Sequence, residues 1–130
     1  MGNEYSKCFA CGKNNPIGLK LKFFYDEQYA ISKFKLNEKY CGYPNVIHGG
    51  IINTILDEAM AKIIIHKEGE AVTYEMRTNY KKPINSMVEY KVTGRIVNVR
   101  RKIIKSEATI MDENEKIYAE AEATFFRLKK

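Results

Sequence analysis

The feature that most constrains the fold is a long helical pattern at residues 48–66, with the sequence HGGIINTILDEAMAKIIIH. Its apolar residues recur at the spacing of a helix that is buried along one broad side, and they are Ile51, Ile52, Ile55, Leu56, Ala59, Met60, Ile63 and Ile64. At about 100° per residue, a second and smaller arc contains Asn53, Thr54, Asp57 and Ala61. A solvent-facing arc usually carries long charged side chains, whereas this one is small and polar. The pattern therefore predicts a helix whose second arc contacts a ligand or another chain.

The two ends of this helix are also marked in the sequence. Gly49 and Gly50 at its start leave the first N–H groups uncovered, which suits an incoming anion or a polarised carbonyl. Basic residues and a glycine predict that the helix ends near residues 67–69. Glu58 is expected to form an exposed ion pair with Lys62, one turn further on.

Most of the remaining chain shows the alternation that is typical of β-strands. Residues 18–37 predict a β-hairpin of about eight residues per arm around a polar turn. The residues that follow, up to 47, contain Gly42 and Pro44 and are expected to be irregular. After the helix, strands are predicted at 71–81, 86–99, 102–112 and 116–128, with a bend or bulge at Gly94. This order, β-β-α-β-β-β-β, predicts an α+β fold in which about six strands curl around one helix.

The length and the absence of long apolar runs bound the class of protein. A chain of 130 residues is most simply one domain, residues 1–130, that buries roughly two thirds of its unfolded surface after a loop-rich lead-in at 1–16. No apolar run approaches the roughly 20 residues that span a bilayer, and the start MGNEYSKC has no apolar signal core. We therefore expect a cytoplasmic protein without a membrane partner. Because one helix and six strands leave the arc around Asp57 outside the core, we also expect a homodimer that covers it across a two-fold axis.

Three cysteines, Cys8, Cys11 and Cys41, cannot all pair, so no disulfide framework is predicted. Cys8 and Cys11 form a CxxC, which in a zinc site would need further ligands such as Cys41 and His48. Structural zinc sites usually show a second pair at short spacing, and this sequence has none. We therefore favour a packed, reduced turn and expect no metal, with zinc as the alternative.

Positive charge is concentrated in one segment of a chain whose net charge is +6. Five basic residues fall within eleven positions without an acid among them, namely Arg95, Arg100, Arg101, Lys102 and Lys105. Such a cluster suits phosphate binding, and an ordinary charged strand edge explains it equally well. Nucleic acid is not expected as a partner, because no recognised nucleic-acid motif accompanies the charge.

Several motifs, taken in order, resemble those of hotdog-fold acyl-CoA thioesterases. The sequence HGGxxxxxxD is met by residues 48–50 and Asp57, and the further pieces are CFACGKNNPIGLKLKFF at 8–24, GYPNVIHGG at 42–50 and VTYEMRTNYKKPI at 72–84. The resemblance covers nearly the whole chain and is greatest to the phenylacetate-pathway thioesterases and their mammalian thioesterase-superfamily relatives. It implies a hotdog fold, one long central helix wrapped by a curved antiparallel sheet. It also implies a homodimer or a dimer of dimers, and no cofactor apart from the CoA of the substrate.

The resemblance implies a role for four residues at the reaction centre. Asp57 matches the acid that acts as general base or as nucleophile against the thioester carbonyl. The backbone N–H of Gly49 matches the oxyanion donor, and His48 matches the histidine that shapes the same corner. Thr73 falls where relatives place a hydroxyl, contributed across the dimer, that orients the acid or the water.

The resemblance also implies which residues bind the substrate. The acyl end is expected near the helix start and the CoA phosphates at the basic cluster, and the residues are Asn53, Gly50, Asn45, Arg100, Arg101 and Lys102. Some relatives carry an Asn or Gln six residues before the histidine, where this chain has Gly42. Asn45, from the same loop, is a candidate for that role.

The chemistry of thioester hydrolysis fits the same helix. The reaction needs a donor for the developing oxyanion and a base or nucleophile for the carbonyl carbon, and N–H groups at a helix start supply about 3 kcal/mol of barrier lowering. Asp57 lies about two and a half turns along the helix, too far to reach the N–H groups of its own helix start. Two antiparallel helices in a dimer would bring the acid of one chain to the glycines of the other. The alternative function is a non-catalytic acyl-CoA or acyl-carrier binding module of the same fold.

Overall fold

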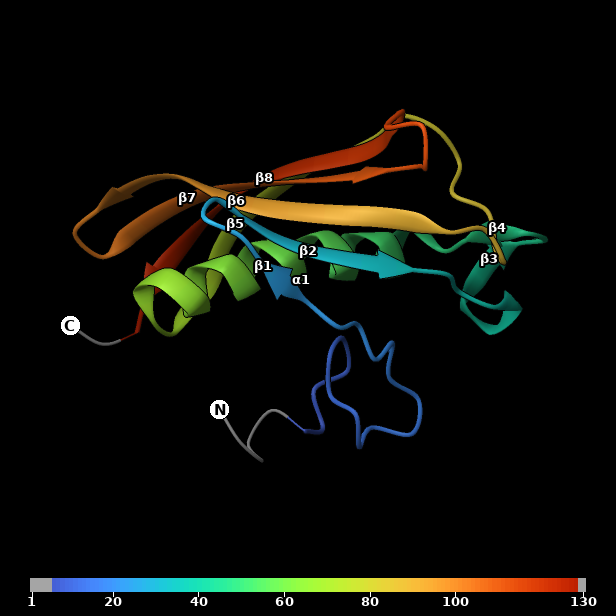
Figure 1. Cartoon of the computed structure of the whole chain (residues 1–130), viewed down its shortest axis with the longest axis horizontal. Coiled ribbons are helices and arrows are strands. Elements are labelled where there is room, and N and C mark those ends of the chain that lie inside the picture. Colours follow the sequence, from blue (N-terminus) through green and yellow to red (C-terminus); the bar gives the residue numbers. More distant parts are fainter. Residues whose placement is uncertain (1–5, 129–130) are drawn as a thin grey trace.

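The computed structural model describes residues 6–128, so residues 1–5 of the expected lead-in lie outside the described residues. One long helix, α1 (Gly49–Glu68), packs against the inner face of a six-stranded antiparallel sheet (Figure 1). The sheet has the order β1-β2-β6-β7-β8-β5, and its strands are β1 (Phe24–Tyr25), β2 (Tyr29–Phe34), β5 (Ala71–Tyr80), β6 (Tyr90–Arg100), β7 (Ile103–Met111) and β8 (Ile117–Arg127). The predicted α+β architecture, one helix wrapped by six strands, is confirmed.

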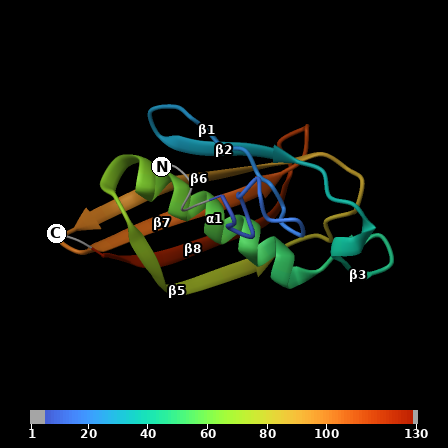
Figure 2. The same ribbon diagram turned by 90° about the horizontal axis from the view of Figure 1, so that it is seen from below.

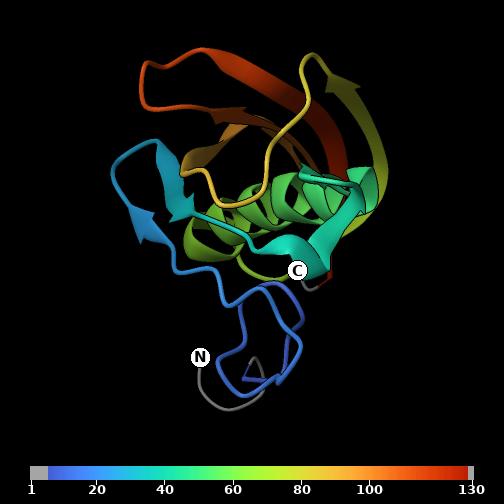
Figure 3. The same ribbon diagram turned by 90° about the vertical axis from the view of Figure 1, so that its right-hand side faces the viewer.

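The sheet curls around the helix, and the lead-in lies on the other side of it. Figure 2 shows α1 lying along the sheet, with β5 at one edge and β2 toward the other. Figure 3 shows the described part of the lead-in, residues 6–16, below α1, on the side away from the sheet. A short 3-10 helix, η2 (Glu38–Tyr40), and a two-stranded hairpin of β3 (Cys41–Tyr43) and β4 (Val46–Ile47) precede α1. The prediction that this stretch is irregular was therefore wrong for its two short strands.

The predicted apolar side of α1 forms the centre of the core. Its buried residues are Ile52, Ile55, Leu56, Ala59, Met60, Ile63 and Ile64. The helix ends where the glycine signal predicts, because Gly69 is the C-cap and its N–H donates to the carbonyl of Ile64 at 3.1 Å. Within residues 6–128, no helix combines the length and the apolar character needed to cross a membrane.

Two predicted strands begin later than expected. The first hairpin arm has two residues in the sheet, because the preceding segment pairs with the lead-in: Leu19 N–H donates to Phe9 O at 2.7 Å and Leu21 N–H to Ala10 O at 2.9 Å. Lys20 between them has a φ of 58°, which interrupts an extended strand. Likewise β6 begins at Tyr90, after Met87 with a φ of 62°. Long-range backbone pairing has overridden the local alternation in both cases.

Gly94 marks a close approach of the helix to the sheet. The register between β6 and β7 is regular through Gly94, and its irregularity falls between Ile96 and Asn98, so the prediction of a bulge at Gly94 was wrong. A Cβ atom on Gly94 would lie 2.4 Å from the carbonyl oxygen of Ala59 and 3.0 Å from the nitrogen of Met60. Glycine at this position therefore lets the backbone of α1 rest directly on β6.

Replacing Gly94 with alanine is expected to lower the free energy of unfolding by about 2–3 kcal/mol. The added methyl group meets helix backbone, which no change of rotamer relieves, so helix and sheet must move apart. Urea denaturation measures the effect, with Gly42→Ala as the control. A Cβ atom on Gly42 would lie no closer than 3.4 Å to its neighbours, so that variant should stay within about 0.5 kcal/mol of wild type. Equal stability of the two variants would contradict the expectation.

Candidate active site

The first turn of α1 leaves one N–H group available. His48 is the N-cap, and its Nδ1 accepts a hydrogen bond from the N–H of Gly50 at 2.9 Å. The carbonyl of His48 accepts from the N–H groups of Ile51 and Ile52 at 3.0 and 3.2 Å. Among residues 6–128, the N–H of Gly49 has no acceptor. The histidine thus orders the helix start and leaves Gly49 as the donor that a ligand oxygen can use.

Asp57 lies halfway along the helix, half-buried, with one hydroxyl partner. The Oγ1 of Thr73 donates to the Oδ1 of Asp57 at 2.7 Å. Burial raises the pKa of the Asp57 carboxyl above its ordinary value, and the hydrogen bond from Thr73 offsets part of this rise. In the described chain this hydroxyl comes from the same chain as Asp57, and its contribution across a dimer stays a prediction.

Strand β5 places three hydroxyls against the small arc of α1. Each donates to one helix residue: Tyr80 to the carbonyl of Gly49 at 3.0 Å, Thr78 to Oδ1 of Asn53, and Thr73 to Oδ1 of Asp57. The three helix residues are spaced by four and so lie on one stripe. The small arc is therefore partly covered by β5 of the same chain, whereas the sequence predicted that only a second chain would cover it.

A β-bulge explains how Thr73 joins this row. Side chains alternate along a strand, so Thr73 should face away from Thr78 and Tyr80. The pairing of β5 with β8 shifts between Thr73 and Glu75, and this irregularity reverses the alternation. Thr78 and Tyr80 were not among the predicted site residues. Their shared alternation would have placed them on one face, but a strand's partner cannot be read from alternation alone.

The loop before the helix contains Gly42 and Asn45. Gly42 lies beside His48, since its Cβ would be 3.4 Å from the imidazole Cδ2. Asn45 is in the exposed turn between β3 and β4 with a φ of 67°, and its carbonyl accepts from the N–H of Ser86 at 3.0 Å. The Asn45 side chain forms no hydrogen bond within the part of the chain that the structure describes. Its predicted role in place of an amide at position 42 therefore has no contact to support it.

A shallow groove opens beside the helix start. It has a volume of about 350 Å³ and is lined by Val46, Ile47, Gly49, Ile52, Tyr80 and residues 81–84. Its lining is largely apolar apart from two lysines and the tyrosine hydroxyl. The N–H of Gly49 therefore lies next to a surface that suits a hydrocarbon group.

The predicted phosphate-binding residues lie at the other end of the helix. Arg100 ends β6, and Arg101 and Lys102 form the exposed turn that leads into β7. None of the three is in an ion pair within residues 6–128. Arg95, the first member of the basic cluster, is instead paired with Glu107 at 3.0 Å. Helix α1 has 20 residues, so this turn and the Gly49 N–H are separated by about 30 Å along the helix axis of one chain.

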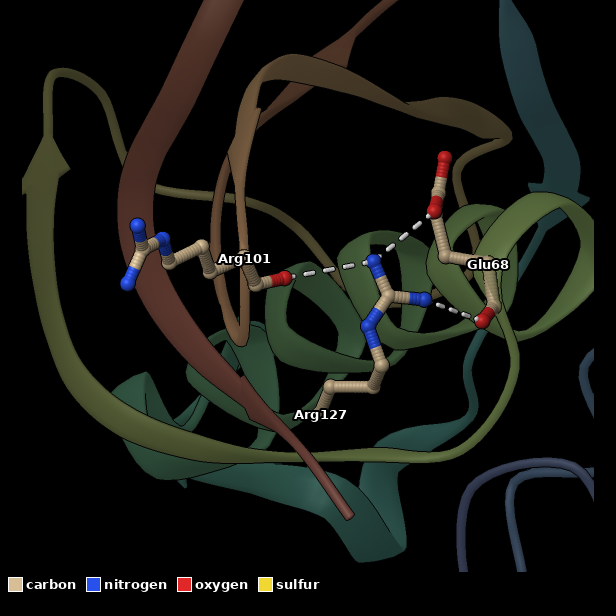
Figure 4. Close-up of polar contacts among 3 residues, drawn as sticks. All are labelled: Glu68, Arg101 and Arg127. Atoms are coloured by element: carbon tan, nitrogen blue, oxygen red, sulfur yellow. Dashed lines mark hydrogen bonds and ion pairs between the residues drawn. The ribbon is translucent and has the colours of Figure 1, made fainter. Parts of the chain in front are cut away.

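Arg127 fastens this turn to the end of α1 (Figure 4). Its guanidinium donates to the carbonyl of Glu68 at 2.7 Å, to the Glu68 carboxylate at 3.0 Å and to the carbonyl of Arg101 at 3.4 Å. Figure 4 shows the side chain of Arg101 pointing away from this contact. Arg127 therefore fixes the backbone of the turn while the Arg101 guanidinium stays available to a ligand.

The side of α1 that faces the lead-in carries a separate group. The predicted ion pair between Glu58 and Lys62 is present at 3.8 Å, but with side chains only 16% and 15% exposed it is not the exposed pair expected. Burial and the Glu58 carboxylate raise the pKa of the Cys11 thiol to about 12, so this thiol is protonated at neutral pH and does not suit a nucleophile. Within residues 6–128, the group of metal-type ligands contains Cys8, Cys11 and Glu58, without Cys41 or His48.

Solved structures share the architecture of this chain. The E. coli PaaI protein from the phenylacetic acid degradation operon superposes with a TM-score of 0.78 at 16% sequence identity, covering 84% of this chain and 84% of that one. A Streptococcus mutans UA159 protein bound to acetyl-CoA superposes with a TM-score of 0.74 at 23% identity, covering 85% of this chain and 90% of that one. The shared fold is the predicted hotdog fold.

Sequence comparison adds a family assignment to the shared fold. The mouse acyl-coenzyme A thioesterase THEM4 is 31% identical over 115 residues, which are 86% of this chain and 50% of that protein. The chain thus spans about half the length of this relative. The family model of the thioesterase superfamily matches residues 44–119, from the turn between β3 and β4 to the start of β8. The chain therefore belongs to the thioesterase superfamily.

Proposed function

We propose that the protein hydrolyses acyl-CoA thioesters to a free acid and CoA, with Asp57 as general base or nucleophile and the Gly49 N–H as oxyanion donor. The observation that carries this proposal is the half-buried Asp57 carboxylate, which Thr73 orients, on the same helix whose Gly49 N–H has no acceptor among the described residues. Family membership supports the reaction class. The mouse relative is an acyl-coenzyme A thioesterase, and the S. mutans structure is bound to acetyl-CoA.

The two groups divide the chemistry between them. As a base, Asp57 removes a proton from water while the water oxygen attacks the carbonyl carbon. As a nucleophile, its carboxylate attacks the same carbon and forms an anhydride that water then hydrolyses. On either route the carbonyl oxygen gains negative charge, which the Gly49 N–H stabilises by about 3 kcal/mol. On the base route the C–S bond then breaks, and the CoA thiolate takes the proton that Asp57 removed from water. On the nucleophile route the C–S bond breaks as the anhydride forms, and the thiolate takes a proton released when water hydrolyses the anhydride.

This division of labour requires two copies of the chain. Asp57 follows Gly49 by eight residues, about 12 Å along one helix, so the two groups cannot act on one carbonyl within a chain. We place Asp57 of one protomer against the Gly49 N–H of its partner, in a homodimer with two shared sites or in a dimer of such dimers. The long edge strand β5 supports this pairing, since in the described sheet it is bonded only to β8 and exposes Val72 and Tyr74.

The same arrangement gives the basic turn a role. We place the CoA phosphates at Arg100, Arg101 and Lys102 of one protomer. We place the acyl group in the groove beside Gly49 of its partner. Asp57 precedes the end of α1 at Glu68 by 11 residues, about 16 Å along the helix axis. An extended pantetheine arm covers that distance, which leaves the thioester near Asp57 while the phosphates meet the basic turn of the same protomer.

CoA release from a panel of short, long and aromatic acyl-CoAs tests the proposed function. Turnover on at least one ester, with a lower KM than the same acyl group on pantetheine, is the expected result. Absence of turnover on every ester, with acyl-CoA bound in calorimetry, would favour a non-catalytic acyl-CoA or acyl-carrier binding module. Absence of both turnover and binding would overturn the proposal.

The acid limb of the pH profile should report Asp57. Its ionised form is the active one, so kcat/KM is expected to fall as the pH drops through an apparent pKa above the 3.8 of an unperturbed aspartate. Thr73→Val removes the hydrogen bond that favours the charged carboxylate of Asp57. The acid limb should therefore move to higher pH, and the plateau value of kcat/KM should fall about tenfold. Thr54→Val is the control, because its hydroxyl donates to the carbonyl of Gly50 and not to Asp57. An acid limb at the same pH in Thr73→Val and wild type would contradict the role of Thr73.

A further inference from the structure

The lead-in holds its CxxC in a rigid turn. The N–H of Gly12, directly after the second cysteine, donates to the carbonyl of Cys8 at 2.8 Å. A Cβ atom on Gly12 would lie 2.4 Å from the nitrogen of Cys8 and from the carbonyl oxygen of Ser6. Only glycine fits so tight a turn, and it directs Cys8 and Cys11 to the same side.

Contacts with the rest of the protein fix the position of this turn. The two residues between the cysteines, Phe9 and Ala10, accept the backbone bonds from residues 19 and 21 that shorten β1. Ala10 is also buried in the hydrophobic core, at 3% exposure. The two thiols are therefore positioned by the fold and need no ligand to bring them together.

Helix α1 supplies a third group at the same place. The ligand atoms of Cys8, Cys11 and Glu58 all lie within 4.8 Å of one another, and all three residues are half-buried. Glu58 is adjacent to Asp57 in sequence but points about 100° around the helix. The group therefore lies between α1 and the lead-in, on the side of the helix that Figure 3 shows away from the sheet.

We propose that Cys8, Cys11 and Glu58 bind a thiophilic divalent cation, of which zinc fits best, and that this ion fastens the lead-in to α1. Two thiolates and one carboxylate are ligands that zinc accepts in tetrahedral geometry, with water at the fourth position. Calcium and magnesium require oxygen ligands, so the two sulfurs select against them. Zinc was not favoured from the sequence because the sequence shows only one cysteine pair at short spacing. In the fold, the third ligand comes from helix α1, which is distant in sequence.

The charges around the group support a divalent ion. The three ligands carry three negative charges, two on the thiolates and one on the carboxylate. Lys62 contributes one positive charge beside Glu58. A dication together with Lys62 therefore leaves the half-buried site electrically neutral, which lowers the cost of burying its charges. The carboxylate has two oxygens, so Glu58 can bind the ion and keep its contact with Lys62.

This site is separate from the proposed thioesterase chemistry. Its helix donor, Glu58, faces the lead-in, whereas the Asp57 carboxylate accepts from Thr73 on β5. The role of the ion is to hold the lead-in against the helix, so its test does not depend on any acyl-CoA activity.

Metal binding to reduced, metal-free protein tests the proposal. Zn²⁺ is titrated against a chromophoric chelator, and Co²⁺ is added as a spectroscopic probe. Wild type should bind one ion per chain, show thiolate-to-cobalt charge-transfer absorption, melt at a higher temperature with Zn²⁺, and have two of its three cysteines protected from a thiol reagent. Cys8→Ser should weaken binding at least about 100-fold and Glu58→Gln at least about tenfold. Cys41→Ser is the matched control and should behave as wild type.

Four outcomes would overturn the proposal. They are Co²⁺ binding without a thiolate band, equal affinity of wild type and Cys8→Ser, equal affinity of wild type and Glu58→Gln, and loss of the site in Cys41→Ser. Circular dichroism of each metal-free variant shows whether it is folded. Protection of the Cys11 thiol by added Zn²⁺ in Glu58→Gln, compared with the same variant without metal, gives a second measurement of binding.

Discussion

Replacing Asp57 with asparagine is expected to lower kcat/KM for acyl-CoA hydrolysis at least about 100-fold. The amide neither accepts a proton from water nor attacks the carbonyl carbon, so both proposed routes lose their base or nucleophile. Its oxygen still accepts the hydrogen bond from Thr73, so the geometry around the helix is kept. Initial rates of CoA release over a range of substrate concentrations measure the effect.

Stability provides the check that Asp57→Asn remains folded. Burial raises the pKa of the Asp57 carboxyl in the folded state. The stability that the protonated carboxyl contributes is therefore complete at pH values below the pKa of the unfolded state, and it is lost as the pH rises through the pKa of the folded state. At neutral pH the ionised carboxylate therefore costs stability, and the neutral amide should melt at the same temperature as wild type or higher. Such a cost is typical of residues kept for function.

Glu75→Gln is the matched control for the charge change. Glu75 is an exposed carboxylate on β5, and its replacement should leave kcat/KM within about twofold of wild type. A rate of Asp57→Asn equal to that of Glu75→Gln would move the catalyst away from Asp57. It would leave the reaction itself in place.

Local patterns were sufficient to predict the main elements. The apolar spacing of α1 depends on residues three and four apart, and alternation along β7 and β8 depends on residues two apart, so both are readable without knowing the partner. Gly69 ends the helix through its own backbone conformation, so the end of the helix was also predictable from the sequence. These signals gave the order of elements, and the order gave the fold class.

Several of the features that were missed depend on contacts with other segments of the chain. Pairing of residues 19 and 21 with the lead-in removes most of the first strand. A glycine inside an alternating strand is expected both at a bulge and where another backbone approaches closely, and Gly94 beside Ala59 is the second case. Glu58 was predicted to be exposed because nothing in the helix pattern indicates that the lead-in covers it.

The candidate site was predictable to a similar extent. Asp57, Gly49 and His48 lie on one helix whose start was marked by glycines, so their relation followed from the period of the helix. Thr73 was named through the resemblance, and it reaches its position through a bulge in β5 that alternation alone would not predict. Thr78 and Tyr80 depend on which strand packs on the small arc, so neither was predicted.

Replacing Gly49 with proline is expected to lower kcat/KM about 100-fold or more, because it removes the N–H that the proposal assigns to the oxyanion. Proline is favoured at the first helical position, where its missing N–H breaks no helix bond. His48 before it already has a φ of −58° and a ψ of 136°, which a following proline accepts. Gly49→Ala is the matched control: it keeps the N–H, and its Cβ would lie 3.7 Å from the Tyr80 ring.

Coexpression of Gly49→Pro with Asp57→Asn then tests whether two chains share each site. In a hybrid dimer, one site carries both defects and the other combines the intact Asp57 of one chain with the intact Gly49 of its partner. Random pairing makes half of the dimers hybrids, so about one quarter of wild-type activity should return. Purification through two different affinity tags isolates the hybrids, in which about half should return. Hybrid dimers without activity would contradict a shared site, because a site contained within one chain is damaged in both subunits.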